Sequence, residues 1–356
     1  MQLPPLSRPL LAAAFASTGF LLASAGATRV LKRRAERRYP DAGGHVDVDG
    51  ARLRYTDSGA GRPVVLVHGL LGSAYDFDLG LTGLAAERYR LVAFDRPGSG
   101  YSDEAAPRDQ SPITQAALLH AAARELGLDR PVLVGYSLGA PVVMAWAELF
   151  PTEVAAVVSV SGHVMPYALW YANWVRLLRL PLVVPIGSET ICLPYGPMLG
   201  HALLRLACFP QPVPVGYARA ALAVGLRPHA VRHAALDLDQ VYADLRLLSA
   251  GYADVQAPVV VIGGVQDRIA PFGESVAFHR RLPNARLIAV GDGGHALHVT
   301  HPSEVLKAID LAAEMAAGSA LRPRLAATPL TGRDRRAAYA TPLDERTSLA
   351  AGEAVA

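Results

Sequence analysis

The chain has 356 residues, of which 51% are hydrophobic and 18% are charged, and its formal net charge is only +3. That length can bury a large core, and it suffices for one large domain with an insertion or for two domains. Small net charge, without a basic stripe of interleaved aromatics, argues against nucleic-acid binding. The only two cysteines, Cys192 and Cys208, exclude a disulfide framework and a cysteine-based zinc site; we expect buried thiols rather than a bridge.

The N-terminal segment, residues 1–40, looks like a membrane anchor with a basic stretch behind it. Residues 9–28 carry no charge, and about 20 such residues can cross a bilayer as a helix. Lys and Arg crowd into residues 29–38, which places the following domain in the cytoplasm by the positive-inside rule. The small residues before Ala25 leave open an alternative, a signal sequence cleaved there and an exported enzyme. We expect a chain without residues 1–40 to fold.

The next segments alternate between strand and helix patterns. Alternating apolar and polar residues around Asp49–Gly50 predict a hairpin over residues 43–61. Continuous apolar runs predict strands that are buried on both faces of a sheet, at 62–69, 90–95, 131–137 and 154–162. Helical spacing falls between them, at 81–89, 113–128 and 138–150.

Residues 163–250 interrupt this rhythm with scattered prolines, aromatics and helical fragments. It then resumes with strands and helices at 257–264, 273–282, 285–290 and 303–318. The alternation predicts an α/β fold, a mostly parallel twisted sheet with helices on both faces. The core would comprise residues 41–162 and 251–318, and residues 163–250 would form a helical cap insertion. Residues 319–356 lack periodicity and are predicted to be a disordered tail.

A serine between two glycines stands at the end of the strand predicted over 131–137. The sequence Gly135-Tyr-Ser-Leu-Gly139 is G-x-S-x-G in a strand-to-helix context, which is typical of a nucleophile elbow. Small residues at both ends let the backbones approach closely, so that the Ser137 hydroxyl would lie near the N-terminus of the next helix. The alternative is a turn serine that merely caps that helix.

A serine nucleophile needs a base, and the base needs an orienting carboxylate. Asp267 and His295 each follow a predicted strand, and the order Ser, Asp, His is that of nucleophile-elbow hydrolases. Asp292 is the rival acid, but it precedes His295 by only three residues, and Asp254 lies before its strand. His298 and His301 could suggest metal ligands together with His295, but no carboxylate or cysteine accompanies them at ligand spacing. We therefore predict a Ser137–His295–Asp267 triad and no metal.

Acyl transfer also needs an oxyanion hole. One donor should be the backbone N–H of Leu138, directly after the nucleophile. The second should come from the loop His68-Gly-Leu-Leu-Gly-Ser73 that follows the strand at 62–69. We favour the N–H of Leu70, with that of Leu71 as the alternative.

Together, the motifs HGLLGS, FDRPGSGYSD, GYSLGA, GGVQDRIAP and GDGGHALH resemble the α/β-hydrolase superfamily over residues 45–318. The similarity is greatest to capped bacterial members related to haloalkane dehalogenases, epoxide hydrolases, C–C bond hydrolases and cofactor-free haloperoxidases. Dehalogenases and epoxide hydrolases of this group carry Asp at the nucleophile position, where this chain has Ser137. The resemblance implies that Ser137 forms an acyl-enzyme, that His295 shuttles the proton, and that Asp267 orients His295, without a cofactor.

The cap sequence favours a lipophilic substrate. Trp170 and Trp174 are four residues apart and would share a helical face, either as cap core or as the wall of an apolar pocket. We predict a serine hydrolase for neutral, lipophilic carboxylic esters. Alternatives are a C–C bond, amide or lactone hydrolase, an acyltransferase or perhydrolase, and a non-catalytic membrane-anchored binding module. The expected partners are a small apolar ester and the membrane.

Overall fold

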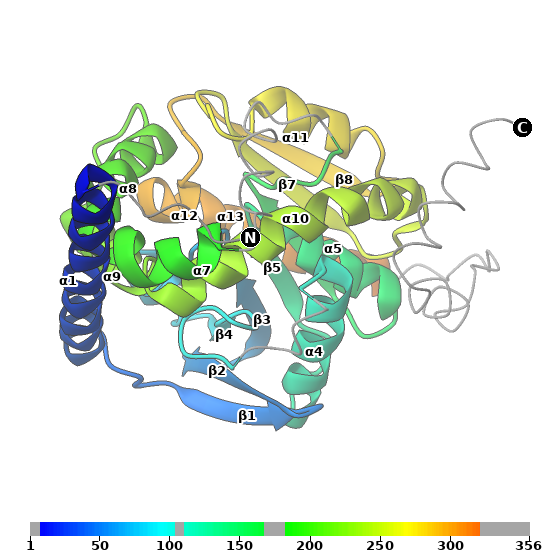
Figure 1. The fold of residues 1–356 in the computed structure, drawn as a ribbon. Coiled ribbons are helices and arrows are strands. Elements are labelled where there is room, and N and C mark those ends of the chain that lie inside the picture. Colours follow the sequence, from blue (N-terminus) through cyan, green and yellow to red (C-terminus); the bar gives the residue numbers. More distant parts are fainter. Residues whose placement is uncertain (1–7, 104–109, 167–181, 321–356) are drawn as a thin grey trace, which may run out of the picture.

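The computed structural model describes residues 8–103, 110–166 and 182–320 (Figure 1). Its centre is an eight-stranded sheet with the order β1-β2-β4-β3-β5-β6-β7-β8. The strands are β1 (Gly44–Val48), β2 (Ala51–Ser58), β3 (Arg62–Val67), β4 (Tyr89–Phe94), β5 (Val132–Tyr136), β6 (Ala156–Val160), β7 (Val259–Gly264) and β8 (Ala285–Val290). The pairs β1–β2 and β2–β4 are antiparallel, and the other pairs are parallel. The predicted mostly parallel α/β sheet is confirmed.

The predicted hairpin is also present. Val48 pairs with Ala51, so Asp49 and Gly50 alone form the turn. Both have positive φ, 48° and 79°. Two left-handed residues are what a two-residue turn needs to match the twist of its strands, and Asp-Gly accepts that conformation readily.

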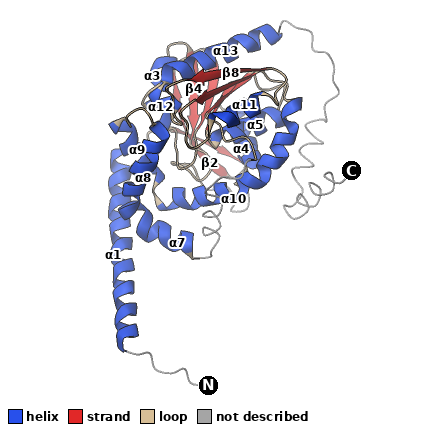
Figure 2. Ribbon diagram, turned by 90° about the horizontal axis from the view of Figure 1, so that it is seen from above, coloured by secondary structure: helices blue, strands red, loops and turns tan. Residues whose placement is uncertain are grey.

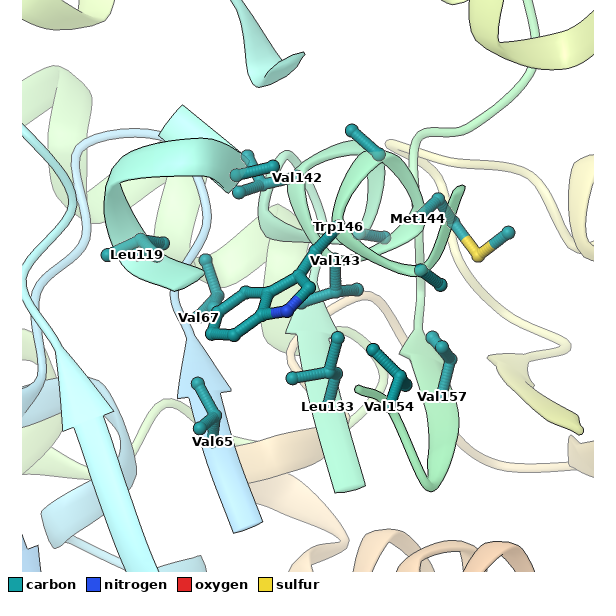
Figure 3. Packing of buried hydrophobic residues seen from close by; sticks show 14 of the residues in the cluster. Val65, Val67, Leu119, Leu133, Val142, Val143, Met144, Trp146, Val154 and Val157 are labelled. Carbon is teal, nitrogen blue, oxygen red and sulfur yellow. The ribbon is translucent and has the colours of Figure 1, made fainter. Parts of the chain in front are cut away.

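Helices cover both faces of the sheet. They are α2 (Tyr75–Asp78), α3 (Leu81–Ala85), α4 (Pro112–Glu125), α5 (Gly139–Leu149), α11 (Phe272–His279), α12 (Leu297–Thr300) and α13 (Pro302–Ala320). Val65, Val67 and Leu133 face α4 and α5, where fully buried Trp146 fills the space between helix and sheet (Figure 3). Their neighbours Val64 and Leu66 point to the opposite face, toward α3 and α13. Because both faces are covered, the strands read as continuous apolar runs.

The cap is helical in the part of residues 163–250 that the structure describes. It comprises α7 (Val183–Gly187), a π-helical turn η1 (Ser188–Cys192), α8 (Leu193–Cys208), α9 (Val215–Gly225) and α10 (Pro228–Gly251). These helices group together beside the N-terminal helix (Figures 1 and 2). Cys192 and Cys208 are both free thiols, and Cys208 is buried. Trp170, Trp174 and most of the predicted tail lie outside the described residues.

The cap is held to the core where it begins. The Glu274 carboxylate of α11 accepts hydrogen bonds from the N–H groups of Val164 and Met165, at 3.1 and 3.0 Å. Its other oxygen lies 3.1 Å from His163 Nδ1. All three contacts are buried, and hydrogen bonds to a charged acceptor in such surroundings are strong. The start of the insertion is therefore fixed relative to the sheet.

The N-terminal helix α1 (Arg8–Arg38) is longer than the predicted span of residues 9–28. Its first part projects freely past the cap (Figure 2), with Phe15 77% and Leu22 69% exposed. Its second part packs on η1, α8 and α9. Ser24 and Thr28 are buried there, because they lie four residues apart and so share one helix face.

Further contacts continue to residue 40. Arg227, only 1% exposed, has Nη1 3.8 Å from the Glu36 carboxylate. The hydroxyls of Tyr101 and Tyr75 donate to the carbonyls of Tyr39 and Pro40. The expected boundary at residue 40 therefore falls inside a contact region, and a chain without residues 1–40 would lose partners of buried groups. A cut near residue 23 avoids this.

Candidate functional site

The structure brings Ser137, Asp267 and His295 together beyond the carboxyl ends of β5, β7 and β8 respectively. The Ser137 Oγ lies 2.9 Å from His295 Nε2, and His295 Nδ1 lies 2.8 Å from Asp267 Oδ2. All three side chains are buried. With its Nδ1–H donated to the carboxylate, the imidazole presents Nε2 as an acceptor for the serine proton. The arrangement can therefore activate Ser137 as a nucleophile.

Backbone strain marks Ser137. It follows β5 and precedes α5, with a left-handed φ of 51°, a conformation that non-glycine residues rarely adopt. The turn is tight enough that an added Cβ on Gly139 would overlap the Val67 carbonyl, and one on Gly135 would lie 2.6 Å from the Ala140 Cα. Backbone hydrogen bonds hold the turn: Ser137 N donates to the Val160 carbonyl at 3.0 Å, and the Ser137 carbonyl accepts the N–H groups of Ala140 and His163 at 3.1 and 3.2 Å. The glycines are thus required by close backbone approach.

Asp267 and not Asp292 reaches the histidine. The second carboxylate oxygen of Asp267 accepts the N–H groups of Ile269 and Ala270, at 2.8 and 2.9 Å, which fixes its orientation. Asp292 has a side chain that is 71% exposed and that pairs with His301 at 3.3 Å.

The cap holds the backbone of the histidine loop. The carbonyl of Ala207, in the last turn of α8, accepts the N–H groups of His295 and Ala296, at 2.8 and 2.9 Å. The same loop approaches the cap so closely that an added Cβ on Gly294 would overlap the Phe209 carbonyl. The position of His295 thus depends on the cap as well as on the core.

His298 lies behind the triad. It is buried against the rings of Phe77, Tyr136 and Tyr217. Burial, aided by nearby His295, lowers the pKa of His298 to about 3, so that the ring is neutral at physiological pH. Neither ring nitrogen has a hydrogen-bond partner among the described residues. No group of three or more potential ligands for a metal ion occurs in the described part of the chain.

The loop His68–Ser73 lies against the nucleophile, where an oxyanion hole would form. An added Cβ on Gly69 would lie 3.0 Å from the Ser137 Cβ. Leu138 is the N-cap residue of α5, and the Leu70 side chain packs against the apolar cluster to which Leu138 belongs. The peptide groups before Leu70 and Leu138 thus lie on either side of Ser137. Leu71, the alternative donor, has a left-handed backbone with a φ of 56°.

Three donors hold the Gly69 carbonyl. They are His68 Nδ1 at 2.8 Å, Arg96 Nη2 at 3.1 Å and Gly72 N at 3.2 Å. His68 Nε2 accepts the Arg96 N–H at 2.9 Å, so the ring is neutral with its proton on Nδ1; burial likewise holds the pKa of His68 well below its usual value. In a trans peptide the C=O of Gly69 and the N–H of Leu70 point in opposite directions. Fixing the carbonyl therefore aims the N–H.

Arg96 also connects this loop to the cap. Its guanidinium lies 2.7 Å from the Asp237 carboxylate of α10 and donates to Gln115 Oε1 at 3.0 Å. Gln115 Nε2 donates in turn to Asp237 at 2.8 Å. All three side chains are buried. The motif around Arg96 was recognised in the sequence, but its link to the cap was not predicted. Its partner Asp237 is distant in the sequence.

We expect Arg96→Lys to lower kcat for ester hydrolysis by about tenfold to a hundredfold with little change in KM, because the Leu70 N–H loses its fixed aim toward developing negative charge. Lys keeps the charge beside Asp237 but cannot reach the three acceptors with a planar fork. Steady-state kinetics with p-nitrophenyl butyrate measure this, and thermal unfolding checks the fold. Unchanged kcat in a stably folded variant would contradict the role of Arg96.

Asp76, in α2, borders the same loop and predicts a pH dependence of stability. Burial raises its pKa to about 8, while the Ser73 N–H lowers it and the charges of Asp95 and Asp78 raise it further. The carboxyl is therefore protonated in the folded protein at pH 7 and ionised in the unfolded chain, whose pKa is about 3.9. Its contribution to stability is present below pH 4 and is lost as the pH rises to 8. We expect Asp76→Asn to flatten the fall of Tm between pH 5 and 8; parallel curves for wild type and variant would contradict this.

One cavity among the described residues lies away from the triad. It has a volume of about 370 Å³ and is lined by His120, Arg124, Arg130, Trp146 and Glu153, among others. These residues lie around the start of β5, and none belongs to the triad. The cavity is therefore not the site at which Ser137 would act.

Comparisons with a family profile and with known proteins both point to hydrolases of the α/β-hydrolase fold. The profile of the family described as "alpha/beta hydrolase fold" matches residues 62–302, well over half of the chain. RutD of Cronobacter turicensis, provisionally named a carbamate hydrolase, is 27% identical over 257 residues, which is 70% of this chain and 91% of that protein.

Solved structures agree in fold. A thermophilic esterase from Thermogutta terrifontis superimposes with a TM-score of 0.63 at 21% identity, covering 77% of this chain and 99% of the esterase. A bacterial membrane phospholipase A gives a TM-score of 0.62 at 22% identity and covers 86% and 96% of the two chains. These similarities and the matched profile support hydrolase activity. The chain belongs to the α/β-hydrolase superfamily.

Proposed function

We propose that this protein is a serine hydrolase of neutral, lipophilic carboxylic esters. The observation that carries the proposal is the buried chain of hydrogen bonds from Ser137 Oγ through His295 to Asp267, at 2.9 and 2.8 Å. Such a chain is what a serine needs in order to attack a carbonyl carbon.

The reaction follows from these positions. Ser137 Oγ attacks the ester carbonyl while its proton passes to His295 Nε2, and Asp267 stabilises the imidazolium. The N–H groups of Leu138 and Leu70 receive the negative charge of the carbonyl oxygen. His295 then protonates the leaving alcohol, which leaves an acyl group on Ser137. Water, deprotonated by His295, releases the acid and restores the serine.

Apolar surroundings favour a lipophilic acyl or alcohol group. Leu138, next to the nucleophile, packs with three buried cap residues of α10 and with partly buried Leu70; the three are Leu238, Val241 and Leu245. A neutral acyl or alcohol chain that lay against these side chains would bury its own apolar surface, which is favourable.

The test is turnover of p-nitrophenyl esters with acyl chains from two to sixteen carbons, with p-nitrophenyl N-alkyl carbamates as the matched comparison. The full chain is used in detergent micelles. A clear chain-length optimum for the esters is expected. Faster turnover of the carbamates would move the assignment toward the substrate class named for RutD. Absence of turnover together with fluorophosphonate labelling of Ser137 would overturn ester hydrolysis while retaining the nucleophile.

We also propose that α1 anchors the enzyme to a membrane, with the catalytic domain on the cytoplasmic side. Among the described residues, one helix is long and apolar enough to cross a membrane, by length and composition alone. Cleavage near Ala25 would remove Ser24, which lies 3.3 Å from the Tyr195 hydroxyl, and Phe20, which stacks on the same ring. Retention of α1 keeps these contacts. The intact mass of the protein extracted from bacterial membranes distinguishes the two: a species that begins after Ala25 would contradict the anchor.

A further inference from the structure

Part of the cap surface is apolar and exposed. Five residues of α7, η1 and the first turns of α8 define what we term the cap apolar face: Val183, Ile186, Ile191, Tyr195 and Met198. Met198 is 84% exposed, Tyr195 50% and Ile186 43%. Isolated apolar residues are common on protein surfaces. A group of exposed apolar residues within one short helical run instead indicates a surface that binds a partner molecule or a membrane.

The cap apolar face lies beside α1. Helix α1 packs directly on η1 and α8. Tyr195 stacks on Phe20 with ring centroids 6.0 Å apart, and its hydroxyl meets Ser24 Oγ at 3.3 Å. The face therefore continues the exposed surface of α1, on which Phe15 and Leu22 are 77% and 69% exposed.

The direction of α1 points to a lipid bilayer as the partner of this face. Figure 2 shows its N-terminal part leaving the body of the protein next to α7 and continuing beyond it. The helical stretch that precedes the contact of Phe20 with Tyr195, residues 8–19, is about 18 Å long at 1.5 Å per residue, which is more than half of the roughly 30 Å hydrocarbon core of a bilayer. A bilayer that takes up this stretch must begin where the cap ends, at the level of α7 and η1.

The positions of the basic residues in α1 agree with a bilayer surface at the level of α7 and η1. The α1 residues that follow the buried Ser24 include Arg29, Arg33 and Arg34, all exposed. They lie toward the body of the protein, where anionic headgroups would meet them, and each basic residue near such a surface contributes about 1 kcal/mol. The apolar residues and the basic residues are thus arranged in the order of the acyl and headgroup regions.

We propose that the cap apolar face docks on the lipid bilayer beside α1, so that the cap and the anchor bind the membrane together. This inference builds on the proposed anchor, but it is independent of the reaction at Ser137. The apolar side chains would enter the boundary between headgroups and acyl chains to a depth of about 5–10 Å.

The experiment measures lipid contact directly. The full chain carrying Ile186→Trp is reconstituted into phosphatidylcholine–phosphatidylglycerol vesicles, with or without lipids brominated on their acyl chains. Leu84→Trp is the matched control, since Leu84 is a 46% exposed apolar residue of α3, which Figure 2 places far from the projecting end of α1. The emission of unsubstituted protein is subtracted from both. We expect brominated lipid to quench the Ile186→Trp emission at least about twofold and to leave Leu84→Trp unchanged.

Flotation of the vesicles separates failure of the face from failure of the anchor. Protein that floats but shows equal quenching at both positions overturns docking and leaves the anchor standing, whereas protein that does not float overturns both. A second copy of the chain could instead cover the face. Cross-linked dimers through Ile186→Cys in vesicles, with no quenching of Ile186→Trp, would establish that and overturn the lipid contact.

Discussion

Ser137→Ala should lower kcat for p-nitrophenyl ester hydrolysis by about a millionfold, because loss of the nucleophile removes the covalent route altogether. What remains should be the slow reaction assisted by binding and by the oxyanion donors. The side chain is small, and its hydroxyl is hydrogen-bonded to His295, so that the fold should be unaffected.

Two controls define the Ser137 experiment. Wild-type protein should react with a fluorophosphonate and the variant should not, since only a serine activated by a base attacks phosphorus rapidly. Thermal unfolding of both proteins should coincide. A purified variant that retains most of the ester hydrolysis would show that another residue is the nucleophile.

Asp267→Asn should lower kcat by about ten-thousandfold, because the amide can donate to His295 Nδ1 and so favours the wrong tautomer. The imidazolium would also lose its charged partner. Asn is nearly isosteric, and its carbonyl oxygen can still accept the N–H groups of Ile269 and Ala270, which hold Asp267 now. The loop should therefore keep its shape.

Asp292→Asn is the matched control, since it is the same change in the neighbouring loop. Asp292 contacts Gln211 and His301 rather than His295, and because its side chain is 71% exposed, these contacts contribute about 0–1 kcal/mol. We expect its kcat to stay within about twofold of wild type. If Asp292→Asn were the more damaging of the two, the catalytic carboxylate would have to be reassigned.

The sequence predicted the sheet and the grouping of the three side chains because both depend on local signals. Buried strands read as apolar runs, and residues that follow parallel strands meet at one edge of the sheet. Gly135 and Gly139 indicated the tight turn around Ser137. The order of Ser137, Asp267 and His295 matched that of nucleophile-elbow hydrolases. Asp292 could be set aside only on spacing, and its contact with His301 became visible in three dimensions.

Contacts between distant segments were beyond such reasoning. Nothing around Asp237 in the sequence indicates that it pairs with Arg96 at 2.7 Å. The uncharged run of residues 9–28 and the basic residues behind it suggested a membrane span, but they did not indicate where the helix ends. In the structure those turns continue as helix, and Thr28 is buried against the cap.

Helix α8 has a consequence for how the membrane and the active site would be connected. It begins at the cap apolar face, and its last turn ends at the Ala207 carbonyl, which holds the N–H groups of both His295 and Ala296. This one helix therefore joins the surface that we propose meets lipid to the backbone that holds His295 beside Ser137.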